Sequence, residues 1–186
     1  MISEELKEKY LGIFVEKLKN VGVDITPLIK SGVDLKNASF THSNEHGNAY
    51  QGSLIEIVLK VLTPYAVKLN ELLPESLRVD KDTLVKVCLL HHIAKAVRLV
   101  PNDNQWEVEK RGFVFKYDNK QPSIRTGLHS MVMAQNVGVS FTPEEAEAMT
   151  INDRELSDDQ ARWYSSVMST IVRMANELTY TEINNR

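Results

Sequence analysis

The chain has 186 residues, of which 42% are hydrophobic, so it can form one globular domain with a core of its own. Its net charge of −3 argues against a nucleic-acid partner. The single Cys88 excludes a disulfide within the chain, and no stretch reads as a signal peptide or a membrane span. We therefore expect a cytoplasmic protein with no membrane association.

The first section of the chain reads as a helical extension. Residues 3–19 place apolar side chains at helical spacing, with Ser3 as the expected N-cap and acidic residues in the first turn. Glycine and proline residues then divide the chain into short pieces. We predict an N-terminal helical extension over residues 1–38 that packs on the core of a main domain at 39–186. The apolar face of the extension would equally suit a second subunit, so a homo-oligomer stays open.

Two further helices are expected in the middle of the chain. One runs over residues 53–73, and Pro64 near its middle predicts a kink or a break. The other covers residues 80–97 with Asp80 or Asp82 as its cap. It is apolar on nearly all sides, so we expect it to lie buried at the centre of the molecule.

The second of these helices carries two adjacent histidines, His91 and His92, followed by Lys95. His91 and Lys95 are four residues apart and so share a helix face, whereas His92 is turned by about 100° from His91. The simplest structural interpretation is that one imidazole is packed and the other is half exposed. From the helix pattern by itself, Lys95 is expected to extend along the helix and place its charge in solvent.

A short β insertion is expected after this helix. Residues 105–117 alternate between apolar and polar side chains on both sides of Gly112, which predicts a small β-hairpin. A lone hairpin is only marginally stable, so we expect it to lean on the helices.

Three helices complete the predicted fold. The first covers residues 125–137, and the second begins at Pro143 with Thr142 as N-cap and Glu145 three residues on. The third covers residues 157–180. Its expected buried side consists of Trp163, Val167, Ile171, Met174, Ala175 and Leu178.

The run from Leu89 to Ala96 resembles the helix that names the HD-domain metal-dependent phosphohydrolases. In that family an apolar run leads into His-Asp and then Ile-Gly-Lys. Here His91 matches the histidine, Lys95 matches a lysine whose position suits a substrate phosphate, and His92 stands where the aspartate would be. The resemblance implies an all-α, HD-domain-like helical bundle, with the hairpin as an insertion similar to that of some bacterial and phage members.

Two other segments follow the same family order. Residues 52–57 resemble the Gly-Gly-Leu-Leu-Glu-His entry to the family's first metal-bearing helix, with Ile57 at the histidine. Counting from the Glu-Glu-Ala segment at 144–146 puts Thr126 and Asn152 at two further histidine positions. A slip of this count would bring His129 or Asp153 into the site instead.

The closing helix supplies the last matching position, where Asn176 stands in place of the family's final aspartate. Among the matching positions only one family ligand type is retained, and none of these positions holds a carboxylate. A hard divalent cation needs the negative charge that a carboxylate supplies. The vestigial metal-site positions are Ile57, His91, His92, Thr126, Asn152 and Asn176.

The resemblance therefore implies a catalytically inactive HD-like domain, a pseudoenzyme that acts as a binding or interaction module and needs no cofactor. Without acidic ligands, the pocket near His91, His92 and Lys95 would be neutral to positive, and it could hold a phosphate-bearing ligand such as a nucleotide without cleaving it.

The alternative is an active metal-dependent phosphohydrolase with a rearranged, histidine-rich site. Three imidazoles and one carboxylate can hold a divalent transition metal if they converge on one point. The residues of this alternative are His91, His92 and His129 with Asp153 or Glu177.

Overall fold

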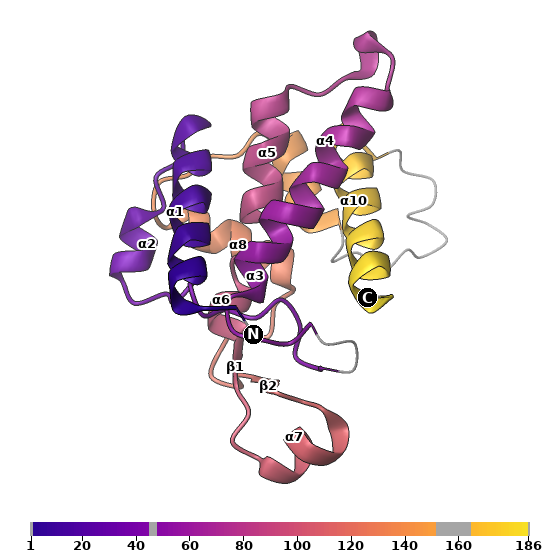
Figure 1. The fold of residues 1–186 in the computed structure, drawn as a ribbon. Helices are drawn as coiled ribbons and strands as arrows, with labels where there is room; N and C mark the ends of the chain where they lie inside the picture. The colour runs from indigo at the N-terminus through magenta and orange to yellow at the C-terminus, as the bar shows by residue number, and fades with distance from the viewer. Residues whose placement is uncertain (1, 45–47, 152–164, 186) are drawn as a thin grey trace.

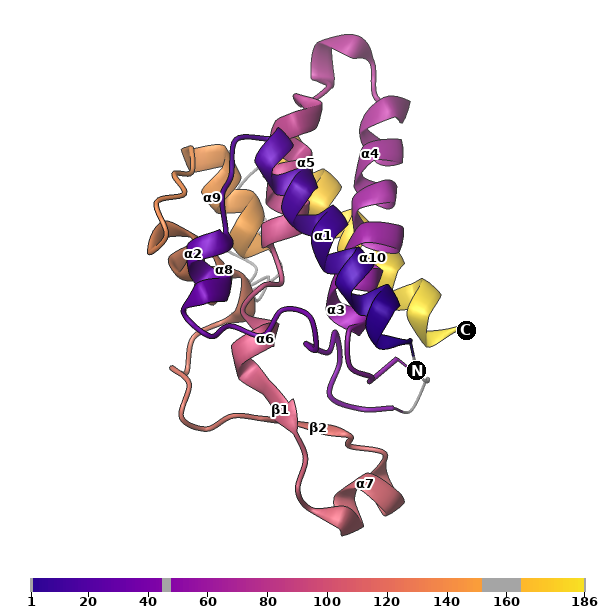
Figure 2. The same ribbon diagram turned by 60° about the vertical axis from the view of Figure 1, so that its left-hand side comes forward.

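A computed structural model describes residues 2–44, 48–151 and 165–185 of the chain. These residues are mostly helical, with one small two-stranded antiparallel sheet, as the sequence predicts. Figures 1 and 2 show the helices gathered in a bundle, with the sheet and α7 projecting from one end. The elements in chain order are α1 (Glu4–Asn20), α2 (Thr26–Lys30), α3 (Ser53–Ile57), η1 (Val58–Leu62), α4 (Thr63–Leu72), η2 (Glu75–Leu77), α5 (Lys81–Leu90), α6 (Lys95–Arg98), β1 (Leu99–Pro101), α7 (Gln105–Arg111), β2 (Phe115–Tyr117), α8 (Thr126–Gln135), α9 (Pro143–Thr150) and α10 (Val167–Asn184).

The bundle is built around α4, α5 and α10. Helix α10 packs against α4 and α9, α4 packs against α5, and α9 also contacts α5 and α8. Figure 1 shows α4 beside α5, and α1 contacts α3 and α5. One hydrophobic cluster extends from α1 to α10, and its fully buried side chains include Phe40, Leu62, Leu90 and Ile93. Removal of this apolar surface from water is the main force that stabilises the bundle.

Helix α1 begins as the sequence predicts. Ser3 Oγ accepts a hydrogen bond from the backbone N–H of Leu6 at 3.3 Å, which satisfies one donor of the first turn. The apolar stripe of the helix, Tyr10, Phe14 and Leu18, is buried in the main hydrophobic cluster. Helix α1 therefore packs on the same core as the later helices.

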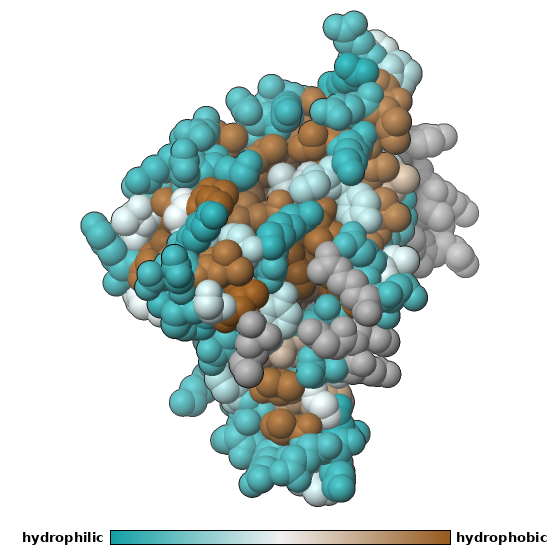
Figure 3. Space-filling view, viewed as in Figure 1, coloured by the Kyte–Doolittle hydropathy of each residue, from teal (hydrophilic) through white to brown (hydrophobic). Residues whose placement is uncertain are grey.

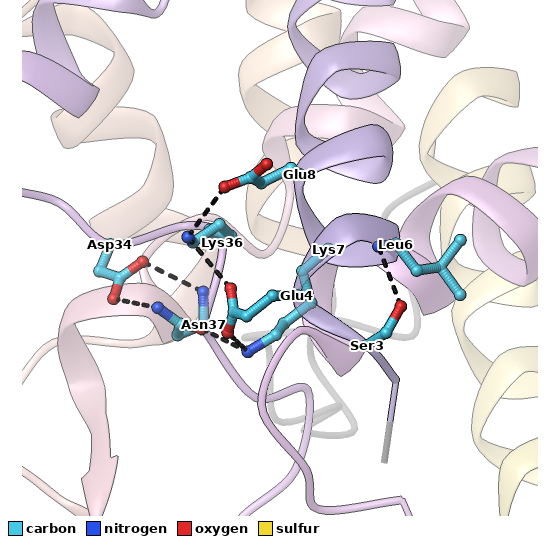
Figure 4. Close-up of polar contacts among 8 residues, drawn as sticks. All are labelled: Ser3, Glu4, Leu6, Lys7, Glu8, Asp34, Lys36 and Asn37. Atoms are coloured by element: carbon cyan, nitrogen blue, oxygen red, sulfur yellow. Dashed lines mark hydrogen bonds and ion pairs between the residues drawn. The ribbon is translucent and has the colours of Figure 1, made fainter.

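A polar network holds the first turn of α1 to the loop that precedes α3 (Figure 4). Lys7 is ion-paired with Glu4, and its Nζ donates to Asn37 Oδ1 at 2.8 Å. Lys36 adds an ion pair to Glu4 at 3.2 Å. Gly52 lies against Lys7 with a φ of 88°, and a Cβ at this position would stand 2.7 Å from Lys7 Cγ. Both the backbone angle and the contact require glycine here.

The helix predicted over residues 53–73 is interrupted at Pro64, as expected. Helix α3 continues into the π-helical turn η1, and the Thr63 N–H closes this turn by donating to Val58 O, five residues back. Proline has no N–H to donate, and its ring crowds the carbonyl four residues before it. A π-helical turn relieves that crowding and lets α4 start at a new register.

The helix predicted over residues 80–97 is correct only in its first part. Asp80 caps α5 through a hydrogen bond from the Thr83 N–H, but α5 ends before His91 and α6 is a separate short helix. Between them, backbone N–H groups donate to carbonyls three rather than four residues back. The Ala94 N–H instead donates to Ser130 Oγ of α8 at 3.0 Å. Ser130 Oγ competes with the backbone carbonyl that would accept this N–H in a continuous helix. The two histidines therefore lie in a tight turn.

The small sheet exists, but the hairpin predicted over residues 105–117 is misplaced. The first strand, β1, precedes this range, and most of the range forms α7 before β2. Asn104 caps α7 by accepting from the Glu107 N–H at 3.3 Å, and Gly112 ends the helix with a φ of 65°. These local capping residues outweigh the apparent alternation of the side chains.

The buried face of α10 matches the predicted one only in part, since Ile171 and Ala175 are buried as expected. Val167, Met174 and Leu178 are 36, 42 and 39% exposed, and Met168 and Val172 are buried in their place. The helix packs against both α4 and α9, so its buried face is centred between these two neighbours. The start of the predicted helix, at residues 157–164, lies outside the described residues.

The sheet and α7 form a projection, and a second, smaller hydrophobic cluster of Ala49, Leu99 and Phe115 joins the sheet to the loop that precedes α3. Figure 3 shows hydrophilic groups over the far end of this projection. None of the described helices has both the length and the apolar character needed to cross a bilayer.

Candidate anion-binding site

The paired histidines lie side by side in the interior, next to the end of α5. His91 is 1% exposed and His92 is 5% exposed, and their ring centroids are 4.5 Å apart in an edge-to-face arrangement. Burial, with a smaller contribution from the nearby Lys95, lowers the pKa of His91 to about 4. The same two causes place the pKa of His92 well below its ordinary range. Both imidazoles are therefore neutral at physiological pH.

His92 is bonded to a residue from the far end of the chain. Its Nε2 lies 2.8 Å from Asn176 Oδ1 of α10, and because an amide oxygen only accepts, Nε2 carries the proton. His92 Nδ1 then holds a lone pair, and it has no hydrogen-bond partner among the described residues. These are two of the positions that the resemblance assigns to metal-binding aspartates.

Lys95, the first residue of α6, is a buried cation held by uncharged groups. It is 8% exposed, and its Nζ donates to Phe40 O at 2.8 Å and to Tyr180 Oη at 2.9 Å. The Nζ also lies 3.7 Å from the centroid of the Phe40 ring. No carboxylate of the described chain pairs with it.

The burial of Lys95 has a direct electrostatic result. Removal of the ammonium group from water lowers the pKa of Lys95 to about 7. The same burial raises the pKa of the Tyr180 phenol to about 12, so the phenol stays protonated. At neutral pH, Lys95 is therefore close to half protonated and lies beside a hydroxyl that can donate or accept a hydrogen bond.

Lys95 lines a cavity of about 420 Å³ together with Arg98 of the same helix, and we call it the Lys95 cavity. Its described lining contains no aspartate or glutamate. Hydroxyl and amide side chains supply most of its other polar groups, and aromatic rings supply much of its apolar surface. The other polar members are Thr41, His42, Ser43, Asn48, Thr126 and Asn184, and the aromatic members include Phe40, Tyr117 and Tyr180.

The sequence-predicted residues divide between the cavity and the core around it. Lys95 and Thr126 line the cavity, whereas His91 and His92 lie outside its lining. The Phe40 ring intervenes, because it lines the cavity and also packs edge-on against the His92 ring at 5.0 Å. Ile57 is 2% exposed in the main hydrophobic cluster.

Sequence reasoning missed Arg98, Phe40 and Tyr180. Arg98 follows Lys95 by three residues, so helical spacing could have drawn attention to it. Its Nη1 donates to Ile124 O, which fixes the guanidinium at the cavity. Phe40 and Tyr180 are distant in sequence, and no local pattern connects them with Lys95.

The residues of the metal-site alternative do not converge in the described part of the chain. No group of three or more His, Cys, Asp or Glu side chains there is placed to hold a metal ion. His129 lines a separate cavity of about 380 Å³, and Glu177 is exposed on α10, 3.9 Å from Arg173. Asn152 and Asp153 lie outside the described residues.

Comparison of the chain with protein-family models, with curated proteins and with solved structures found no match.

Proposed function

We propose that this protein is an HD-like helical domain without phosphohydrolase activity, and that it binds a phosphate-bearing ligand in the Lys95 cavity. The observation that carries the proposal is the pairing of two cationic side chains, Lys95 and Arg98, in a cavity whose described lining has no carboxylate. The guanidinium of Arg98 supplies a positive charge to the cavity in addition to that of Lys95.

The energetics favour an anion in this place. A buried cation without a counter-charge is unfavourable, and a bound anion relieves this by restoring the protonated form of Lys95. Arginine adds planar donors that match phosphate oxygens. The volume of about 420 Å³ lies within the usual range for small-molecule sites, which supports a small phosphorylated compound.

Loss of the family's metal chemistry is supported by the donor atoms at the matching positions. Ile57 has no lone pair, and His92 and Asn176 are neutral and bonded to each other. Such a donor set does not fit a hard divalent cation, which needs carboxylate charge. The contact between His92 and Asn176, 84 residues apart, is also what the HD-like arrangement predicts for two positions at one site.

Binding can be measured by calorimetric titration with sulfate, whose charge is constant across the pH range of interest. We expect Lys95→Met and Arg98→Leu each to weaken sulfate binding by roughly tenfold or more, because each removes a charge-assisted hydrogen bond. Lys17→Met on the exposed face of α1 is the matched control and should leave the affinity within twofold. Equal affinities for all four proteins would refute an anion site in the cavity.

The HD-like arrangement has its own test. In the double variant His92→Asp with Asn176→Asp, two carboxylates stand beside His91, and we expect manganese to raise its melting temperature. The single variant His92→Asn resembles His92→Asp in shape but lacks its charge, so manganese should not change its melting temperature. A double variant whose melting temperature is indifferent to manganese contradicts this arrangement of the site.

A further inference from the structure

Lys95 has an environment unlike that of a lysine held by an ion pair. Its Nζ has two hydrogen-bond acceptors, Phe40 O and Tyr180 Oη, and both are uncharged. Burial favours the neutral amine over the ammonium. A neutral amine has two N–H groups, which these two acceptors can satisfy, and its one lone pair is then not needed for any internal contact.

The position of this amine makes the lone pair relevant to chemistry. Lys95 lines the cavity of about 420 Å³ beside Arg98, so a molecule whose anionic group binds Arg98 would have its remaining atoms close to Nζ. Lysines desolvated in apolar surroundings are the ones that act as amine nucleophiles towards carbonyl groups. The ring of Phe40, 3.7 Å from Nζ, provides such surroundings.

We propose that Lys95 is an amine nucleophile that forms a Schiff base with an aldehyde carrying an anionic group. This inference rests on the proposed anion site, because Arg98 holds the anionic group and thereby places the carbonyl carbon near Nζ. It adds covalent capture of the ligand, which simple anion binding does not require.

Formation of the Schiff base needs no reactant other than the amine and the aldehyde. The Nζ lone pair attacks the carbonyl carbon, the C=O double bond becomes a single bond, and the oxygen takes up a proton to form a carbinolamine. The C–O bond then breaks as the hydroxyl leaves, the nitrogen lone pair forms the C=N bond, and Nζ has lost both its protons to the water that departs. Tyr180, hydrogen-bonded to Nζ at 2.9 Å, donates a proton to the leaving hydroxyl and regains one from the nitrogen.

Reductive trapping tests this directly on the unmodified protein. Pyridoxal 5′-phosphate, a phosphorylated aldehyde, is added at about neutral pH, borohydride reduces any imine to a stable secondary amine, and peptide mass spectrometry locates the label. An ordinary lysine is neutral in only roughly one molecule in a few thousand at that pH. We expect labelling at Lys95 to be at least about tenfold faster than at the exposed Lys17. Labelling spread over exposed lysines, with Lys95 unmodified, would overturn the proposal.

Two comparisons separate the covalent step from anion binding. Pyridoxal without its phosphate should label Lys95 roughly tenfold more slowly, because Arg98 then has no anion to hold. Tyr180→Phe should slow trapping by at least about tenfold, measured as the rate at saturating aldehyde so that a change in affinity does not affect the comparison. If sulfate binds as proposed but Lys95 is never trapped, the Schiff base is refuted and the anion site stands. If sulfate does not bind and the phosphate makes no difference, both are refuted.

Discussion

Two buried lysines, Lys7 in α1 and Lys95 in α6, have opposite surroundings. Both are nearly inaccessible, at 6 and 8% exposed. Lys7 is ion-paired with Glu4 and donates to Asn37, so its charge is balanced within the fold. Lys95 donates to two uncharged groups, the carbonyl of Phe40 and the phenol of Tyr180, and it lines a cavity.

The difference shows that burial of a cation does not by itself define a site. Lys7 with its counter-charge fixes the first turn of α1 and has a structural role (Figure 4). Lys95 is left for a molecule from outside the chain to balance or to react with, and the cavity gives such a molecule access.

The largest effect on stability is expected from Phe40, whose ring shields Lys95. Phe40 is 1% exposed and packs against Lys95, His92 and Tyr180. Phe40→Ala should lower the free energy of unfolding by about 4 kcal/mol, through lost burial and the cavity left behind. Chemical denaturation measures this, with the half-buried Phe113→Ala as the milder control. A loss similar to that of the control would mean that the ring does not support the Lys95 environment.

The second effect is a pH dependence of stability that Lys95→Met should remove. Its pKa is about 7 in the folded protein and has its ordinary value of 10.5 in the unfolded chain. Between these values the unfolded chain holds the proton and the folded protein does not, so stability rises as the pH increases from about 7 to about 10.5. We expect the wild type to gain about 4 kcal/mol over that window relative to Lys95→Met. Parallel pH profiles of the two proteins would contradict a buried, uncompensated lysine.

The next largest effect on stability is expected at Gly52, the glycine that makes room for the Lys7 side chain. Gly52→Ala forces a residue with a Cβ into a φ of 88° and against Lys7 Cγ at 2.7 Å. We expect a loss of about 2 kcal/mol, from strain and the displaced lysine stem. Gly138→Ala is the control for the angle alone, since its φ is 90° and an added Cβ would meet nothing within 4 Å. Equal losses in the two variants would show that the contact with Lys7 contributes nothing.

The smallest effect belongs to Lys7 itself. Lys7→Met keeps the buried stem and removes the hydrogen bond to Asn37 Oδ1, so we expect a loss of about 1 kcal/mol in urea unfolding. Sulfate affinity should be unchanged, in contrast to Lys95→Met. A Lys7 variant that loses sulfate binding would remove the distinction between the two lysines.

Features determined by neighbouring residues could be predicted from the sequence. The Ser3 cap, the interruption at Pro64 and the Thr142 capping box with Glu145 all depend on contacts within a few residues, and all are confirmed. The capping residues of α7 are equally local, but the alternating pattern beside them favoured a hairpin. The mostly helical fold follows from these local features.

Features that depend on distant residues could not be predicted in this way. The early end of α5 depends on Ser130 of α8, and the Lys95 environment brings together residues 40, 95 and 180. The sequence suggests Lys95 as a phosphate contact only through the resemblance, and it cannot reveal that the surrounding groups are uncharged. His92 and Asn176 are matching positions in the sequence, but their direct hydrogen bond is a property of the folded chain.

The most direct test of the central claim is the pKa of Lys95, followed by NMR through its side-chain carbon and nitrogen signals and assigned with Lys95→Arg. We expect a pKa of about 7 in the free protein, as burial without a counter-charge requires, and a clear rise when sulfate is added. A pKa near the ordinary 10.5 that does not respond to sulfate would show that the charge of Lys95 is already balanced, and would contradict both the anion site and the amine chemistry.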